Sequence, residues 1–264
     1  MRRKWSIPVF VLIVMIAGMT ALMTGCGSSG NADGEASTEA TKGAGGDPLK
    51  EFGDKPWVYD AEYEIPTDVE SYTSFNELIQ VSDLVVPYIN IDSPDAKTAN
   101  EELYGVYEEL ISRFNESARD SEEYEGSGYS VSDYEAYVLD TAVSVLVKQT
   151  SGGTDVPWND YYSYSFSLDD GHLLTYEEAC EIAGITPEQA GETVENNIRE
   201  STLKDFSDVP DIETYISQSI DNYETSVSDG SINFLLHDMG LLDVVVKKHV
   251  PAGGGIVNEV IPAK

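Results

Sequence analysis

Residues 161–179 read YYSYSFSLDDGHLLTYEEA, a stretch that predicts a strand, a tight turn, a short second strand and the start of a helix. Strict alternation along the first strand is typical of one packed face and one face in water, so we expect its serines to be solvated. The Asp-Asp-Gly run at 169–171 suits a two-residue hairpin loop. Thr175 and Glu178 have the spacing of a capping box that starts the helix. The packed face contains Trp158, Tyr162, Tyr164, Phe166 and Leu168, and the opposite face contains Ser163, Ser165 and Ser167.

The flanking segments indicate more antiparallel strands and several amphipathic helices. Ser93-Pro94-Asp95 predicts a helix start, and that helix runs to about Glu123. Thr186-Pro187 predicts a second start, for a helix that runs to about Phe206, and a third helix begins at Asp211. Strands are expected at 83–92, 134–139, 141–149, 157–168, 232–237, 242–250 and 256–261. This order predicts an α+β fold, an antiparallel sheet with helices packed mainly on one face.

The N-terminus has the organisation of a secretory signal. Arg2, Arg3 and Lys4 precede an apolar run at 7–19 that is short for a spanning helix. The following Leu22-Met23-Thr24-Gly25-Cys26 resembles the lipobox of bacterial lipoproteins. The resemblance implies cleavage after Gly25, lipidation of Cys26 with acyl chains such as palmitate, and anchoring on the outer face of the cytoplasmic membrane, facing the cell wall. An ordinary secretory signal with a chance cysteine is the alternative.

Composition divides the chain into four parts. Residues 1–25 form the predicted signal peptide, and residues 26–47 are a Gly/Ser/Ala/Glu stretch without large apolar residues, as expected for a flexible tether. Residues 48–79 are predicted to be an extended lead-in. Residues 80–264 are predicted to form a single α+β domain.

The chain is strongly acidic. Its net charge is −33, and removal of residues 1–25 leaves 48 acidic against 12 basic residues, or −36. This charge excludes a nucleic-acid-binding surface. It favours basic partners or, as the alternative, serves only solubility. If Cys26 is lipidated, Cys180 has no cysteine to pair with, and its apolar spacing with Ile182 and Ala183 predicts a buried structural thiol.

Motifs for catalysis and metal binding are sparse. Ser201 and Lys204 match a Ser-x-x-Lys pattern, but the companion motifs of penicillin-recognising enzymes are absent, so a helix surface is the preferred interpretation. His172, His237 and His249 are isolated in sequence and would bind zinc only if the fold brought them together. The acidic run at 120–126 lacks the ligand pattern of an EF-hand. We therefore assign no catalytic, metal or cofactor residue, and Cys26 is the only assigned site residue.

Aromatic residues provide the remaining candidates for ligand contact. Trp158, Tyr161, Tyr162 and Tyr164 form the densest cluster, but alternation assigns most of them to the packed face of a strand. Trp57, in the lead-in, is predicted to be freer to stack on a sugar.

Three segments together resemble a known secreted domain of Firmicutes. They are SPDAKTANEELY at 93–104, YYSYSFSLDDGHLLTYEEA at 161–179 and VPAGGGIVNEVIP at 250–262. Their order resembles the ectodomain of RsiV-type anti-sigma factors, which sense lysozyme; the domain also adjoins some peptidoglycan deacetylases and occurs alone in lipoproteins. The resemblance covers about residues 80–262. The sequence shows no sigma-binding segment and no deacetylase domain, so neither activity is carried over.

The leading hypothesis is a surface-anchored lipoprotein that acts as a non-enzymatic binding or sensing module at the cell envelope. Its partner would be a basic protein such as lysozyme, because the charge and the resemblance both favour one. The alternative is a hydrolase of wall glycan or peptide with unidentified catalytic carboxylates. A third hypothesis is an accessory subunit of an envelope complex.

Overall fold

The computed structural model describes residues 56–123, 128–153, 157–251 and 255–264. These described residues all belong to one compact unit. The predicted signal peptide, the tether and Cys26 lie outside the described residues and stay predictions, as does most of the glycine-rich loop near the C-terminus. Among the described residues, no helix is long and apolar enough to span a bilayer.

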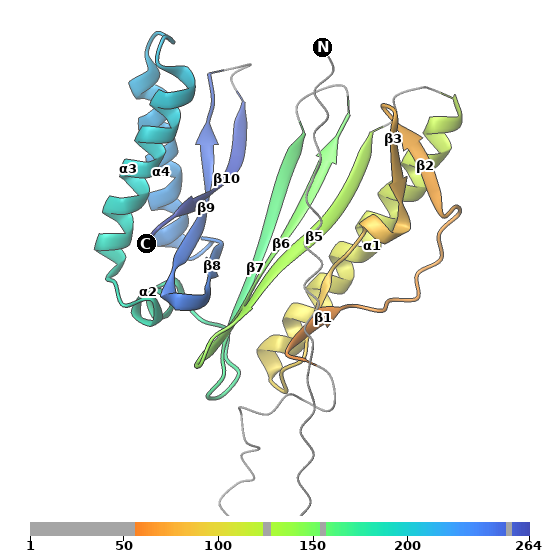
Figure 1. Cartoon of the computed structure of the whole chain (residues 1–264), viewed down its shortest axis with the longest axis horizontal. Coiled ribbons are helices and arrows are strands. Elements are labelled where there is room, and N and C mark those ends of the chain that lie inside the picture. The colour runs from red at the N-terminus through yellow and green to blue at the C-terminus, as the bar shows by residue number, and fades with distance from the viewer. Residues whose placement is uncertain (1–55, 124–127, 154–156, 252–254) are drawn as a thin grey trace, which may run out of the picture. The chain divides into compact units, whose positions relative to one another are not determined.

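The described residues form helices and antiparallel strands, which confirms the predicted α+β class (Figure 1). Two short 3-10 helices, Val81–Asp83 and Asp238–Gly240, lie between strands. The helices are α1 (Pro94–Glu123), α2 (Tyr176–Ala183), α3 (Pro187–Phe206) and α4 (Ile212–Asp229). The strands are β1 (Val58–Asp60), β2 (Ser71–Ser74), β3 (Glu77–Gln80), β4 (Pro87–Ile89), β5 (Tyr129–Val138), β6 (Ala142–Gly152), β7 (Trp158–Ser167), β8 (Phe234–Leu236), β9 (Leu242–His249) and β10 (Ile256–Pro262). They pair as β1-β4, β2-β3, β5-β6-β7 and β10-β9-β8.

The predicted meander forms the β5-β6-β7 sheet, one face of which packs against α1. Val143 lies opposite Phe166 and Val145 opposite Tyr164 in the β6–β7 register. These side chains share one buried cluster with Ala99 and Leu103 of α1, and Leu103 is completely buried. The helix therefore begins at its predicted Ser-Pro start and presents the expected apolar stripe to the sheet.

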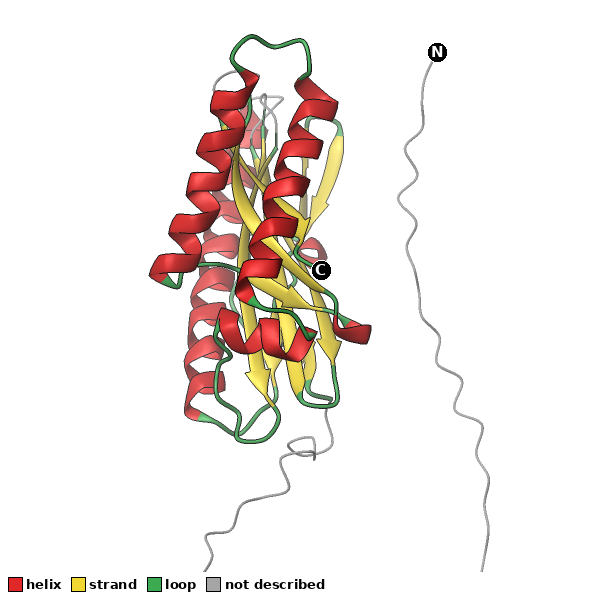
Figure 2. Cartoon of the chain, turned by 90° about the vertical axis from the view of Figure 1, so that its left-hand side faces the viewer, coloured by secondary structure: helices red, strands yellow, loops and turns green. Residues whose placement is uncertain are grey.

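The β8-β9-β10 sheet carries helices α2–α4, which lie in front of the strands in Figure 2. Val244 and Val246 of β9 share a buried cluster with Val194 and Ile198 of α3. The predicted capping box of Thr175 with Glu178 is present at α2, and the predicted start of α3 has a capping box as well, formed by Thr186 and Gln189. Each of the two larger sheets thus has its helices on one face.

The serine face of β7 is buried, so the prediction that it meets water is wrong. Ser165 is 2% exposed, and its Oγ lies 2.7 Å from Oγ of Ser144 on β6. The backbone N–H of Leu236 in β8 donates to Ser144 Oγ at 2.9 Å. Small hydroxyl side chains let β8 lie close against β6 and β7 and satisfy its free N–H groups. Alternation shows that the two faces differ, but it does not show what covers each of them.

The predicted lead-in contains three short strands. Strand β1 pairs with β4, so Val58 lies opposite Ile89. Strands β2 and β3 form a hairpin in which Tyr72 lies opposite Ile79. Both of these side chains are buried in a cluster with residues of α1. The segment before residue 80 therefore packs on the same helix as the meander.

Candidate functional site

The three histidines lie in separate places. His237 Nε2 lies 2.8 Å from Asp243 Oδ2, and the backbone N–H of His249 donates to Ser219 Oγ. His172 belongs to a third group of contacts near the start of α2. Within the described ranges, no group of three His, Cys, Asp or Glu side chains is arranged to hold a metal ion.

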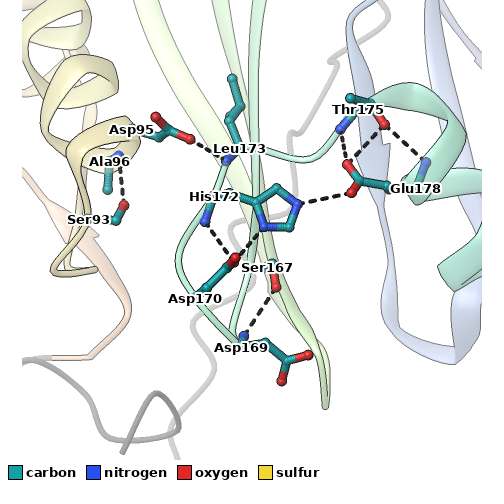
Figure 3. A network of polar contacts seen from close by, with 10 residues as sticks. All are labelled: Ser93, Asp95, Ala96, Ser167, Asp169, Asp170, His172, Leu173, Thr175 and Glu178. Atoms are coloured by element: carbon teal, nitrogen blue, oxygen red, sulfur yellow. Dashed lines mark hydrogen bonds and ion pairs between the residues drawn. The ribbon is translucent and has the colours of Figure 1, made fainter. Parts of the chain in front are cut away.

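His172 bridges two carboxylates in the turn between β7 and α2 (Figure 3). Its Nδ1 lies 2.5 Å from Asp170 Oδ1 and its Nε2 lies 3.1 Å from Glu178 Oε1. The contact with Asp170, followed by the one with Glu178, raises the pKa of His172 above its ordinary value. The next residue, Leu173, donates its N–H to Asp95 in the first turn of α1. This network fixes the turn against two helices.

Ser201 meets a lysine, but not the one in its sequence motif. The ammonium of Lys248 on β9 donates to Ser201 Oγ at 2.9 Å and to Glu259 Oε2 at 2.8 Å. Lys248 is 2% exposed. A general base must accept the serine proton, whereas this ammonium donates a hydrogen bond to the serine oxygen. The three residues, called here the lysine cluster, join α3 to the β9–β10 hairpin through a buried ammonium and a partly exposed carboxylate.

Cys180 is a free, completely buried thiol, as predicted. Burial raises its pKa, which disfavours the reactive thiolate. It lies in the apolar cluster beneath α2 together with Tyr176 and Tyr223, whose hydroxyl oxygens are 3.0 Å apart. The residue is part of the core and has no chemical role in this arrangement.

Two of the aromatic predictions are wrong. Trp158, expected on a packed face, is 42% exposed, and its Nε1–H donates to Asp160. It lies at the start of β7. Trp57, expected to be free, is half-buried against the cluster formed by α1 and the meander. Tyr164 is buried, as predicted, and donates to Glu102 of α1.

A hollow lined by aromatic and charged side chains lies between the segment after β1, strand β4 and the first turns of α1. It has a volume of about 830 Å³. We call it the tyrosine groove and define it by Tyr63, Tyr88, Asp92, Lys97, Glu101 and Tyr104, all of which line it. Its size falls within the range of ligand-binding pockets, and its walls combine aromatic rings with a few charged groups.

Local sequence explains how the groove is held open. The side-chain amide of Asn100 on α1 accepts from the N–H of Ile89 and donates to its carbonyl oxygen, at 2.8 and 2.9 Å. This two-point contact fixes β4 beside the helix, while Ser93 Oγ caps α1 by accepting from the N–H of Ala96. The wall of the groove is therefore formed by rigid elements.

The tyrosines lie close to one another. The rings of Tyr63 and Tyr104 meet edge to face with centroids 5.0 Å apart, and Tyr59 stacks on Tyr88 at 5.2 Å. Burial, followed by the neighbouring phenols of Tyr88, Tyr59 and Tyr104, raises the pKa of Tyr63. The Tyr63 hydroxyl is buried and has no hydrogen-bond partner in the described part of the chain. A buried hydroxyl without a partner is uncommon and often marks a functional position.

Sequence reasoning missed this groove. Tyr59 and Tyr63 belong to the segment predicted to be an extended lead-in, and Tyr104 lies outside the apolar stripe of its helix. The pairing of β1 with β4 places Tyr59 beside Tyr88, and the Asn100 contact with Ile89 brings α1 to the same strand. The one local signal was Tyr104, a large aromatic side chain that is 40% exposed on the polar side of α1.

No protein-family model matches this chain, and no curated protein sequence matches it. The resemblance to the RsiV-type ectodomain therefore stays a prediction. The functional argument rests on the geometry of the tyrosine groove and on charge.

Proposed function

We propose that this chain is a surface-anchored lipoprotein that binds a basic protein, such as lysozyme, at the cell envelope without catalysing a reaction. The observation that carries the proposal is the tyrosine groove, a preformed hollow in an acidic domain, with aromatic rings and carboxylates at its wall. Aromatic side chains in such hollows are the usual anchors of protein interfaces.

Charge supports the choice of partner. Residues 56–264 contain 42 acidic and 9 basic side chains, so at least 33 carboxylates have no lysine or arginine to pair with. An excess of this size attracts basic proteins over several ångströms and speeds their association. The lipid anchor on Cys26 would hold the domain on the outer face of the cytoplasmic membrane, where secreted basic proteins arrive.

The lysine cluster argues against Ser201 as a catalytic nucleophile. Its serine accepts a hydrogen bond from an ammonium that is itself paired with a carboxylate. No observation on the described residues favours the hydrolase alternative, which stays a prediction from the acidic composition.

The test is calorimetric titration of residues 44–264, the compact unit, with lysozyme at low salt and at about 0.15 M salt, where the Debye length is about 8 Å. We expect binding that persists at the higher salt, because a shaped interface is screened less than long-range attraction. Cytochrome c, a basic protein without activity on cell walls, is the control for charge alone. Equal binding of both proteins, or heat that disappears with salt, would overturn the proposal.

A further inference from the structure

We infer that the tyrosine groove is the site that receives arginine or lysine side chains of the basic partner. The inference rests on the proposed function and adds the ligand chemistry of one site. A cation over the face of a tyrosine is attracted by the ring quadrupole, and nearby carboxylates strengthen the attraction. The groove brings these two kinds of group together at one wall.

Three polar side chains of the groove wall are already used within the fold. The Asn100 amide is bonded on both sides to Ile89, and the side-chain N–H of Asn90 donates to the carbonyl oxygen of Pro56. Ser93 Oγ accepts the N–H of Ala96. These amide and hydroxyl groups are therefore less able to bond saccharide hydroxyls than unpaired groups would be.

The groups that remain are rich in electrons. The rings of Tyr88 and Tyr104 line the groove, whereas the hydroxyl oxygen of Tyr63 is buried and offers a ligand no exposed acceptor. Asp92 forms no ion pair with any described lysine or arginine, although the carboxylate of Glu101 lies 3.9 Å from the ammonium of Lys97. A guanidinium group carries donors only, so it matches this set of acceptors and rings.

Lys97 lets the inference predict the direction in which ligand affinity changes when a charge is removed. It is the one basic side chain among the residues that line the groove, and its own side chain is 78% exposed. A cationic ligand is repelled by this ammonium, whereas an anionic ligand would be attracted by it. Loss of Lys97 should therefore tighten the binding of a cationic ligand.

The experiment measures lysozyme affinity at about 0.15 M salt for matched pairs of variants of residues 44–264. We expect Tyr104→Ala to weaken binding about threefold to thirtyfold, the range of a cation–π contact, with Trp158→Ala as the control. Tyr104 and Trp158 are similarly exposed, at 40% and 42%. Trp158 lies at the first residue of β7, whereas the turn that follows the other end of β7 approaches Ser93 at the groove, so the control lies at the opposite end of the strand.

Charge is tested by two further pairs. We expect Lys97→Ala to tighten binding about twofold to fivefold and Asp92→Asn to weaken it by a similar factor. The controls are Lys204→Ala on α3 and Asp221→Asn on α4, which make the same changes in net charge on the other helical layer. Changes in the groove variants no larger than those of their controls would overturn the inference while leaving lysozyme binding, and thus the proposed function, intact.

A direct probe of the groove further distinguishes a failure of this inference from a failure of the proposed function. Amide NMR spectra of residues 44–264 are recorded with a tetra-arginine peptide and with a tetramer of N-acetylglucosamine. We expect the peptide to shift the resonances of Asp92 and Tyr104, and Tyr104→Ala to reduce this shift. Shifts at these residues with the sugar alone would overturn the inference in favour of a glycan site.

Discussion

The lysine cluster and the tyrosine groove both gather polar side chains from distant parts of the chain, yet they differ in how those groups are satisfied. In the lysine cluster, the ammonium of Lys248 has two partners within 3 Å, Ser201 and Glu259. In the groove, the Tyr63 hydroxyl is buried without a partner among the described residues, and Asp92 forms no ion pair there.

We propose that this difference separates a structural site from a binding site. A buried ammonium is stable only when a carboxylate and further hydrogen bonds replace its water. A binding site needs the opposite, because groups that are already paired have little to offer a ligand. The Ser-Lys contact, which resembles catalytic chemistry most closely, is therefore the less functional of the two regions.

The largest expected effect tests the structural side of this comparison. Glu259→Gln leaves Lys248, which is 2% exposed, without its carboxylate. We expect a loss of about 2–4 kcal/mol in the free energy of unfolding, measured by urea denaturation. The double variant Lys248→Met with Glu259→Leu should recover most of the loss, because it removes both charges. A loss below about 0.5 kcal/mol would mean that the pair does not support the fold.

A second prediction concerns the buried serines, whose hydroxyl groups have hydrogen-bond partners, as the groups of the lysine cluster do. Ser144→Ala removes the acceptor of the Leu236 N–H and the partner of Ser165. We expect a loss of about 1–3 kcal/mol in unfolding free energy, because a buried N–H is left without a hydrogen bond. Ser228→Ala, at an exposed position of α4, is the control and should change stability by less than about 0.5 kcal/mol. Equal effects of the two changes would show that β8 does not depend on this contact.

A third prediction uses pH. Because the pKa of His172 is raised in the folded chain, its contribution to stability is complete below its ordinary value and is lost as pH rises through the raised value. The pKa of Asp170 is lowered, mainly by His172, so its contribution is lost as pH falls through the lowered value. We expect His172→Gln to cost at most about 1 kcal/mol near pH 5.5, because the pair is partly exposed, and less at pH 9.

Thermal unfolding of both chains across this pH range is the measurement. His249→Gln is the control, since the ring of His249 forms no ion pair in the described residues. A difference between the chains that grows toward pH 9 would contradict the assigned contacts.

The smallest expected effect tests the groove itself. Tyr63→Phe removes a hydroxyl that has no partner in the described residues, so we expect unfolding free energy to change by less than about 0.5 kcal/mol. Tyr223→Phe is the matched case, because its hydroxyl is bonded to that of Tyr176, and it should cost about 1 kcal/mol. A large loss of unfolding free energy in Tyr63→Phe, measured by urea denaturation, would mean that this hydroxyl stabilises the fold.

Much of the fold was predictable because the responsible contacts are local. The capping boxes of Thr175 and Thr186 each act over three residues, and both helices start where the sequence indicates. The α1 stripe and the β5-β6-β7 meander follow in the same way from periodicity. The burial of Ser165 did not follow, because a strand about 70 residues away in sequence covers that face.

The candidate site was much less predictable. The Ser201–Lys204 pattern placed a lysine one turn away on the same helix, yet the lysine in contact lies 47 residues away in sequence on β9. The tyrosines of the groove come from one strand, a connecting segment and a helix, and none of these segments alone shows the site.

The sequence by itself determined the helix starts, the β5-β6-β7 meander, the α+β class and the strong negative charge, because each depends on neighbouring residues or on composition. Tertiary structure decided which polar groups are satisfied and which are left for a ligand. Lys248 is paired with Glu259, whereas Asp92 at the groove forms no ion pair among the described residues. Hydrogen bonds and ion pairs act over only a few ångströms, so their partners are fixed when distant segments pack together.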